Sequence, residues 1–281
     1  MKHCTAEVKK FDFYAYVNGQ YMPKSTQNHY YGIHALFLEV LKSREISREA
    51  SICQTRLKWW EQVLSDIEKD KKPREPVGVV IKAAKENSKI NFKLLSRLVD
   101  YQLFDIDRGD MQSMTELEIY AENTRSLLLY LNLHLLKIDD SNALTAASHI
   151  GRCLGICDIL KKLPFYLAVH RGYLPQDILL KNNVYFDRMW SKNFDGIMNE
   201  EFYDVVLEIA AYAKKHLEVG RSLQSKLPKN SHRAFILAVE ADHFLTELEK
   251  HNFDVFDPAM RKKSMLTVPW AMYRAVKKGT Y

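Results

Sequence analysis

Apolar residues recur at intervals of three and four along most of the chain, which is the spacing of one face of an α-helix. The clearest stretch begins at Thr115, because Thr115 and Glu118 have the spacing of a capping box that satisfies the first free amides of a helix. One apolar stripe follows and predicts a buried helical face as far as Leu135. Its members are Leu117, Tyr120, Ala121, Thr124, Leu127, Leu128, Leu131 and Leu135.

The next helix is predicted over residues 141–162, with Pro164 expected to end it because proline lacks the amide donor. Gly151 and Gly155 lie on its inner face. Glycine within a helix costs about 1 kcal/mol relative to alanine. The two glycines therefore predict a close backbone neighbour or a cavity.

Further helices are predicted over 199–227 and after Ser231, which can cap the second of them. Their inward residues are expected to be Phe202, Val205, Ile209, Tyr212, Ala213, His216, Leu217 and Gly220, then Phe235, Ala238, Ala241, Phe244, Leu245 and Leu248. Earlier, residues 33–40, 48–69, 77–87 and 92–99 also have helical spacing, and no alternating strand pattern competes with it. The prediction is one all-α domain over 1–281, within which residues 1–25 are candidates for a peripheral position.

Composition supports a folded protein with a substantial core, since 47% of the residues are hydrophobic and 27% are charged. Four widely spaced or helix-spaced cysteines form no disulfide framework, which favours a reducing compartment. No uncharged stretch approaches the roughly 20 apolar residues of a membrane span. The first residues resemble neither a signal peptide nor an Arg-rich presequence, so a leader is either unusual or missing from this sequence.

The net charge of +6 is compatible with an anionic partner, but the basic runs at 69–72 and 261–263 lack interleaved aromatic residues. We therefore expect no nucleic-acid partner. Residues 270–278 are apolar and then basic, and they are the candidate for contact with an anionic membrane surface.

Three motifs occur in a fixed order between residues 115 and 177. Residues 116–120 read Glu-Leu-Glu-Ile-Tyr, 151–160 read Gly-Arg-Cys-Leu-Gly-Ile-Cys-Asp-Ile-Leu, and 170–177 read His-Arg-Gly-Tyr-Leu-Pro-Gln-Asp. This order resembles the squalene/phytoene synthase superfamily, in which a Glu-Leu-x-x-Tyr helix precedes Asn-x-x-Arg-Asp-x-x-x-Asp and a Gly-Arg-x-Tyr-Leu-Pro-x-Asp loop. The resemblance implies an isoprenoid-synthase-like helical bundle around a central cavity.

In active members of that superfamily, the two aspartates of the second motif hold magnesium against the substrate diphosphate, and the metal neutralises the leaving group. The matching positions here are Lys162 and Tyr166, and Asp158 and Lys161 replace the preceding Asn and Arg. A unit charge ~4 Å from another is worth roughly 4 kcal/mol near a protein surface. The resemblance therefore implies a lysine that repels magnesium.

The first aspartate-rich motif of the superfamily, Asp-Asp-x-x-Asp, is also missing. Its paired aspartates fall on Leu41 and Lys42, which leaves Glu45 as the one candidate survivor, although the register is open by one or two residues. We expect no catalytic residue, no metal and no other cofactor.

Arg125 stands where synthases have a small residue that leaves room for a prenyl chain after the tyrosine of the first motif, here Tyr120. Residues 120–124, 146–151 and 171–177 are most similar to the non-catalytic mitochondrial branch of the superfamily. That resemblance implies a peripheral location on the matrix side of the inner membrane. It also implies a role in the assembly of complex I (NADH:ubiquinone oxidoreductase), with early assembly intermediates or subunits as partners.

A second hypothesis is that the cavity still binds a ligand. Lys161, Lys162 and Arg171, together with Lys42, are placed to cradle a diphosphate or a lipid headgroup without metal. The chain would then be a metal-independent isoprenoid-diphosphate or lipid-binding protein, or a prenyl transferase.

Other groups of polar residues are interpreted structurally. His149 and Cys157 are about 12 Å apart along a helix, too far to share one ion with Cys153 between them. The acidic group Asp105, Asp107 and Asp110 lacks calcium-loop spacing and is predicted to be a solvated loop, with a place at the pocket rim open to Asp105. The single histidines are expected to be packed or partly exposed rather than catalytic, namely His134, His216 and His243.

Overall fold

The computed structural model describes residues 2–47, 49–88, 90–186 and 200–281, and the regular secondary structure of these residues is entirely helical. The all-α prediction is therefore confirmed. The helices before the middle of the chain are α1 (Lys2–Phe11), α2 (Phe13–Gly19), α3 (Lys24–Ser43), α4 (Ala50–Glu68), α5 (Pro76–Ser88), α6 (Phe92–Asp107), α7 (Met114–Ala121), the π-helix η1 (Glu122–Ser126) and α8 (Leu127–Leu135). Those that follow are α9 (Ser141–Ala168), α10 (Gln176–Lys181), α12 (Glu200–Ser222), η2 (Gln224–Lys226), α13 (His232–Phe235), α14 (Ala238–Lys250), η3 (Pro258–Arg261) and α15 (Thr267–Lys278).

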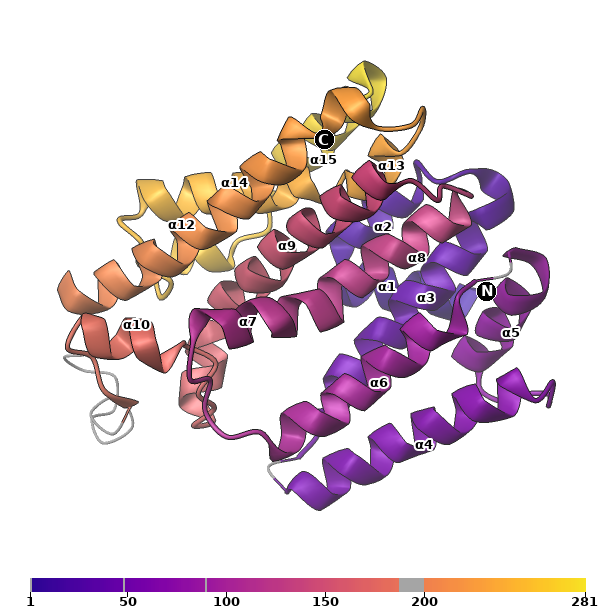
Figure 1. Ribbon diagram of the computed structural model, residues 1–281, viewed down its shortest axis with the longest axis horizontal. Helices are drawn as coiled ribbons and strands as arrows, with labels where there is room; N and C mark the ends of the chain where they lie inside the picture. The colour runs from indigo at the N-terminus through magenta and orange to yellow at the C-terminus, as the bar shows by residue number, and fades with distance from the viewer. Residues whose placement is uncertain (1, 48, 89, 187–199) are drawn as a thin grey trace.

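Helix α9 lies at the centre of the arrangement, with α7 and α8 along one side and α12 and α14 along the other (Figure 1). Helix α3 packs on α8 and carries α1 and α5, while α4 lies along α6 at the outer edge (Figure 1). By length and composition α9 alone among the described helices could cross a membrane, but 67% of its most apolar window is buried inside the molecule. Its hydrophobicity is thus that of a core helix.

The apolar stripe predicted after Thr115 is buried along its whole length. Its helix begins earlier than predicted, because the Ser113 side chain accepts a hydrogen bond from the Glu116 amide at 3.4 Å and so caps α7. The apolar spacing did not predict the π-helical turn η1 between α7 and α8, because apolar residues still recur at steps of three and four across it.

The two glycines of α9 explain how that turn fits. A Cβ added to Gly155 would lie 2.5 Å from Ala121 Cβ, and one added to Gly151 would lie 2.3 Å from Ser126 Cα. Ala121 and Ser126 flank or end the π-helical turn. The predicted close backbone approach is therefore confirmed, and it seats η1 directly on α9.

Several predicted boundaries are wrong. The helices predicted over 33–40 and 92–99 are parts of the longer α3 and α6, and two ends later in the chain also differ. Pro164 lies inside α9, which continues to Ala168, because Tyr166 and Leu167 beyond it are buried and their packing offsets the hydrogen bond that proline cannot donate. Helix α12 ends at Ser222, not at residue 227, and its predicted start at 199 lies outside the described residues. Within α12, Tyr212 is exposed although its spacing predicted an inward position.

Residues 2–19, which belong to the candidate peripheral segment 1–25, contribute to the packed interior. Cys4 and Val8 of α1 and Ala15 of α2 are buried against the rest of the core. Between these helices Asp12 caps α2 by accepting a hydrogen bond from the Ala15 amide at 3.0 Å. This cap leaves the second Asp12 oxygen free to reach across the molecule.

Candidate functional site

A cavity of about 830 Å³ opens between α3, α9 and α14, with α1, α2 and the η1 turn completing its wall. Its size falls in the range of small-molecule sites. The apolar part of the lining consists of Phe11, Phe13, Phe37, Leu38, Leu41, Leu154, Ile159, Leu237, Phe244 and Met260. Six of the nine residues that the sequence singled out also line it, namely Tyr120, Arg125, Asp158, Lys161, Lys162 and Tyr166.

Arg125 is the centre of a charged triad in the cavity wall. Its Nε lies 2.5 Å from Asp158 on α9, and its Nη1 lies 3.0 Å from Asp12 at the start of α2. The guanidinium also stacks 4.9 Å from the ring centroid of Phe37 on α3. Arg125 therefore fills the space that a small residue would leave open, and it joins three parts of the chain.

The electrostatics of the triad favour the charged forms. Burial penalises the Arg125 cation, but Asp158 and Asp12 more than offset this, so the pKa of Arg125 lies above its ordinary value. Burial likewise opposes ionisation of Asp12, and the charge of Arg125 and the Ala15 amide still hold the pKa of Asp12 below its ordinary value. Arg125 and Asp12 are thus ionised at neutral pH.

The two neighbouring lysines of α9 are also paired with carboxylates. Lys161 forms an ion pair with Glu240 of α14 and lies 4.9 Å from the ring centroid of Phe244. The Lys162 ammonium is 2.7 Å from the Glu45 carboxylate. Burial disfavours the charged form of Lys161, but Glu240 and Asp158 raise its pKa above the ordinary value. Each of these lysines is therefore neutralised within the protein.

The remaining predicted site residues lie off the cavity. Lys42 binds Glu7 at 3.2 Å and sits 3.1 Å from the centroid of the Phe11 ring. Arg171 donates a hydrogen bond at 2.5 Å to the carbonyl oxygen of Arg44. Glu45 reaches the cavity only through its partner Lys162. The structure therefore does not bring Lys42 and Arg171 together with Lys161 and Lys162 as one anion cradle.

The prediction of a solvated acidic loop is wrong for Asp105. Its carboxylate is buried at the end of α6, bound to Arg108 at 2.8 Å and to the Tyr173 hydroxyl at 2.5 Å. The centroid of the Tyr173 ring lies 4.4 Å from that of Tyr166 and 5.4 Å from that of Tyr120. Both of these tyrosines line the cavity. Asp105 thus orders the aromatic end of the cavity from behind and does not stand at its rim.

These residues do not fit the magnesium ions that the resemblance implies for active members. Magnesium prefers oxygen ligands in near-octahedral geometry. At the matching positions Lys162 presents an ammonium group bound to Glu45, and Tyr166 presents a phenol whose pKa burial raises well above its ordinary value. Across the described part of the chain, no three His, Cys, Asp or Glu side chains converge to hold a metal ion.

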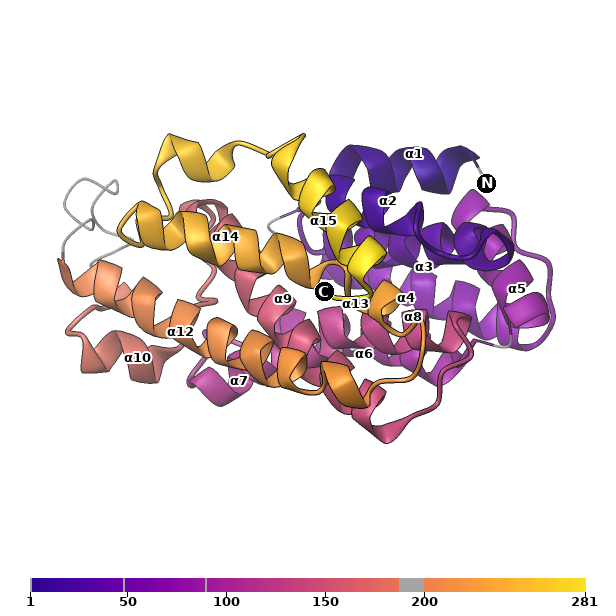
Figure 2. The same ribbon diagram turned by 90° about the horizontal axis from the view of Figure 1, so that it is seen from above.

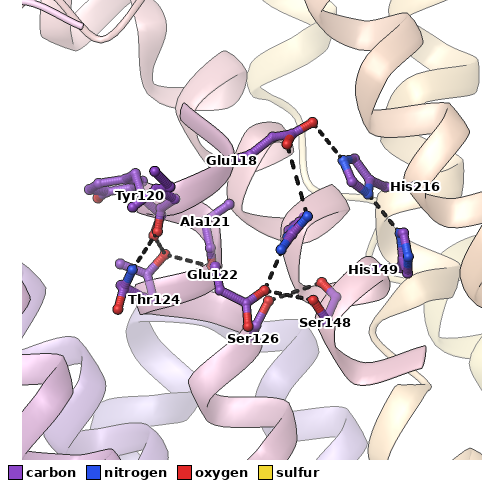
Figure 3. Close-up of polar contacts among 12 residues, drawn as sticks. Glu118, Tyr120, Ala121, Glu122, Thr124, Ser126, Ser148, His149 and His216 are labelled. Carbon is purple, nitrogen blue, oxygen red and sulfur yellow. Dashed lines mark hydrogen bonds and ion pairs between the residues drawn. The ribbon is translucent and has the colours of Figure 1, made fainter. Parts of the chain in front are cut away.

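A second polar cluster, which the sequence did not reveal, ties the η1 turn to α9 and α12. His216 lies between His149 and Glu118, with Nδ1 2.9 Å from His149 Nδ1 and Nε2 3.0 Å from Glu118 (Figure 3). Nearby, Glu122 accepts hydrogen bonds from Ser148 at 2.8 Å and Arg152 at 3.1 Å. The members come from four elements, so spacing along one helix could not group them.

This cluster is arranged for holding helices together. The Ser148 hydroxyl donates to Glu122 and not to a histidine, so the nucleophile–base pair of a hydrolase is not formed there (Figure 3). Burial raises the pKa of Glu122, but hydrogen bonds from Tyr130, Ser148 and Arg152 hold it below its ordinary value. The ionised Glu122 thus anchors the π-helical turn to α9.

The fold and the motifs agree with comparisons to known proteins. The family model for squalene/phytoene synthase matches residues 8–269. The chain belongs to the squalene/phytoene synthase family. Three curated relatives, similar over most of their length, carry names that refer to NADH dehydrogenase (ubiquinone) complex I, assembly factor 6. The mouse protein is 30% identical over 96% of this chain and 80% of its own length, and the human protein is 29% identical over 99% and 82%. The homolog from Drosophila melanogaster is 29% identical over 90% and 76%.

Solved structures of this family share the fold. A dehydrosqualene synthase in complex with ligand superposes with a TM-score of 0.83 at 18% identity, covering 99% of this chain and 95% of that one. A squalene synthase from Alicyclobacillus acidocaldarius superposes with a TM-score of 0.75 at 14% identity, covering 90% and 94%. This chain thus has the helical scaffold of the synthases, and the three curated relatives described above carry assembly-factor names.

Proposed function

We propose that this protein is a non-catalytic assembly factor for mitochondrial respiratory complex I. It would act on early assembly intermediates or subunits, from a peripheral position on the matrix side of the inner membrane. The support for an assembly role comes from relatives that are named complex I assembly factors and that are similar over 90% or more of this chain. Similarity over the whole chain favours a shared role, because it extends beyond the cavity to the outer faces of the bundle.

The observation that carries the non-catalytic part of the proposal is the pairing of cations and carboxylates in the cavity wall. Arg125 is bound to Asp158 and Asp12, Lys161 to Glu240, and Lys162 to Glu45. A divalent ion entering this cavity would have to displace one of these cations from its carboxylate. For the mostly buried pairs of Arg125, removing one partner costs about 3–5 kcal/mol. The Lys162–Glu45 pair costs less to break, because the Lys162 side chain is 44% exposed. The charge that magnesium supplies to active synthases is therefore replaced by fixed cations that are already neutralised.

A test in solution addresses catalysis. In titration calorimetry, purified protein is expected to show no magnesium binding of micromolar affinity. It is also expected to consume neither farnesyl nor geranylgeranyl diphosphate. Turnover above a blank without protein, abolished by changing Lys162 or Tyr166, would overturn the non-catalytic assignment.

A test in cells addresses assembly. Loss of the protein from its own cells is expected to produce an isolated deficit of complex I on native gels, with the other respiratory complexes unchanged. Normal complex I together with altered sterols or carotenoids would refute the assembly role and favour a synthase.

A second candidate function is the binding of an amphiphilic lipid or isoprenoid, and the open volume of the cavity favours it. Because Lys161 and Lys162 are paired within the wall, the headgroup would bind Arg261, Lys262 and Lys263, which line the cavity from its mouth and are exposed. The apolar lining from Phe13 to Phe244 would hold the chain. Mass spectrometry of gently purified protein tests this: a bound lipid lost on charge reversal of residues 261–263 supports it, and an empty cavity refutes it.

A further inference from the structure

The net positive charge of this protein comes from one segment of the sequence, residues 258–281. Of its 41 Lys and Arg residues, six lie in residues 258–281, which contain no Asp or Glu. The 35 that remain in residues 1–257 equal the 35 acidic residues there, so the segment 258–281 carries the whole net charge of +6. Within the described residues, none of Arg261, Lys262 and Lys263 forms an ion pair with a carboxylate.

The same segment presents large apolar side chains to solvent. Helix α15 packs on α14 and α2 through Val268, Met272 and Ala275, which are buried. Figure 2 shows α15 crossing α14 near the place where α14 adjoins α13. The opposite face of α15 follows the helical spacing of four, three and four, and its members are Leu266, Trp270, Tyr273 and Lys277.

This face is exposed although the segment is held firmly in place. Leu266 is 83% exposed, Trp270 61% and Tyr273 41%. The Tyr14 hydroxyl accepts a hydrogen bond from the Ser264 amide at 3.0 Å, and the Tyr281 hydroxyl donates to the Gly220 carbonyl oxygen at 2.9 Å. Both ends of the segment are thus tied to the bundle, and the fold itself directs these apolar side chains outward.

The aromatic and cationic groups are arranged as one surface. The Trp270 and Tyr273 rings stack with centroids 5.5 Å apart, and the Lys277 ammonium lies 5.7 Å from the Tyr273 ring. On the other side of Leu266, residues 261–263 supply three further cations. We call this surface the Trp270 face: residues 261–263, Leu266, Trp270, Tyr273 and Lys277.

We propose that the Trp270 face docks the protein on an anionic lipid bilayer. Tryptophan and tyrosine are enriched at the depth of lipid headgroups, and lysine and arginine bind the phosphates of anionic lipids. Leu266, which is the most exposed large apolar residue among those that the structure describes, inserts below them. This inference rests on the peripheral membrane contact of the proposed function and assigns it to a defined surface.

Charge complementarity favours lipid over a protein partner, because the residues that make up the Trp270 face are apolar or cationic and include no Asp or Glu. The position of the face adds a second reason. Lys262, Lys263 and Ser264 also line the mouth of the cavity, so docking through the Trp270 face turns that mouth toward the bilayer. A lipid entering the cavity would then need no passage through water.

The first test uses tryptophan fluorescence of the full chain with vesicles of one part cardiolipin to two parts phosphatidylcholine, in which the lipids are brominated near the headgroup. The bromine atoms are expected to quench Trp270. Trp270→Phe should abolish the quenched fraction. Trp59→Phe, which removes a tryptophan that is 46% exposed on α4, should leave it unchanged.

The second test measures binding to the same vesicles by sedimentation. Changing Arg261, Lys262 and Lys263 to alanine is expected to weaken binding about a hundredfold, since each cation near an anionic surface contributes about fivefold. The matched control changes Lys69, Lys71 and Lys72, an exposed basic run between α4 and α5, and should bind like the unaltered chain. Leu266→Ser should weaken binding without changing its dependence on salt.

Three results would overturn the docking surface: no binding by the unaltered chain, equal losses in both triple variants, or quenching that survives Trp270→Phe. A further outcome is that the unaltered chain does not bind vesicles, while Trp270→Ser lowers the amount of complex I on native gels. In that case the Trp270 face contacts a protein, and the lipid assignment is wrong. Failure of the assembly role would appear differently, as normal complex I in cells without the protein, whatever the vesicles show.

Discussion

Replacing Arg125 by methionine removes the cation that joins Asp12 of the α2 cap to Asp158 of α9. Methionine keeps most of the side-chain volume, so the change is mainly one of charge. The side chains of Arg125, Asp12 and Asp158 are only 13%, 14% and 26% exposed, and the two carboxylates would be left facing each other. Removing one partner from a buried pair costs about 3–5 kcal/mol. We expect Arg125→Met to lower the free energy of unfolding by about 4 kcal/mol.

The assay is urea unfolding followed by circular dichroism at neutral pH, with the slope against denaturant used to verify that the folded state is unchanged. Arg56→Met is the matched control, because Arg56 binds Glu39 at 2.5 Å but its side chain is 42% exposed. Exposed pairs contribute about 0–1 kcal/mol, so the control should lose no more than this.

A compensating variant isolates the electrostatic part of the effect. Asp12→Asn with Asp158→Asn removes both carboxylates, and asparagine at position 12 still caps α2. Adding these changes to Arg125→Met should recover about 2 kcal/mol, since residues in one network are strongly coupled. If Arg125→Met costs no more than Arg56→Met, or if the compensating changes add further loss, the triad does not hold the cavity wall and the reasoning fails.

Three further predictions concern the scaffold. Burial lowers the pKa of His34 from 6.5 to about 4 in the folded protein. Below pH 6.5 the unfolded chain therefore binds more protons than the folded one. The free energy of unfolding should fall by up to about 3 kcal/mol as the pH is lowered from 6.5 to 4. His34→Leu should flatten that profile in unfolding experiments and His134→Leu, at an exposed position, should not; equal profiles would contradict the assignment. Gly155→Ala should lower the melting temperature through a loss of about 2 kcal/mol by overpacking against Ala121, whereas Gly109→Ala, with open space around it, should be neutral; the reverse order would refute the close approach. Asp105→Asn should cost about 3 kcal/mol and Asp107→Asn, which is exposed, under about 0.5 kcal/mol; similar losses would show that Asp105 is not the anchor of the tyrosine cluster.

Helical periodicity predicted the architecture well because most of the helices bury one continuous face. The stripe from Leu117 to Leu135 is buried throughout, and the glycines of α9 predicted the close approach to Ala121 and Ser126. Periodicity could not locate the π-helical turn, and the proline rule failed at Pro164, because packing of Tyr166 and Leu167 outweighs the local preference of the backbone.

The candidate site was predictable only in part. Motif positions named Arg125, Asp158, Lys161 and Lys162, and these do line the cavity. Their partners came from elsewhere in the chain: Asp12 is 113 residues from Arg125, and Glu240 is 79 residues from Lys161. Because local sequence does not show such pairs, the motif positions alone predict cations that are free to bind a ligand. The same limit hid the contact between His149 and His216, which lie 67 residues apart on two helices.

The most direct measurement is a rescue experiment in cells that lack the protein, with complex I quantified on native gels. The variant Lys162→Met with Tyr166→Phe removes every group at the matching metal positions that could be recruited to catalysis, and leaves side chains of similar volume. We predict that it restores complex I to the level reached by the unaltered chain. A folded, stably expressed variant that fails to restore complex I would show that chemistry at these positions is needed, and would contradict a role as a non-catalytic scaffold.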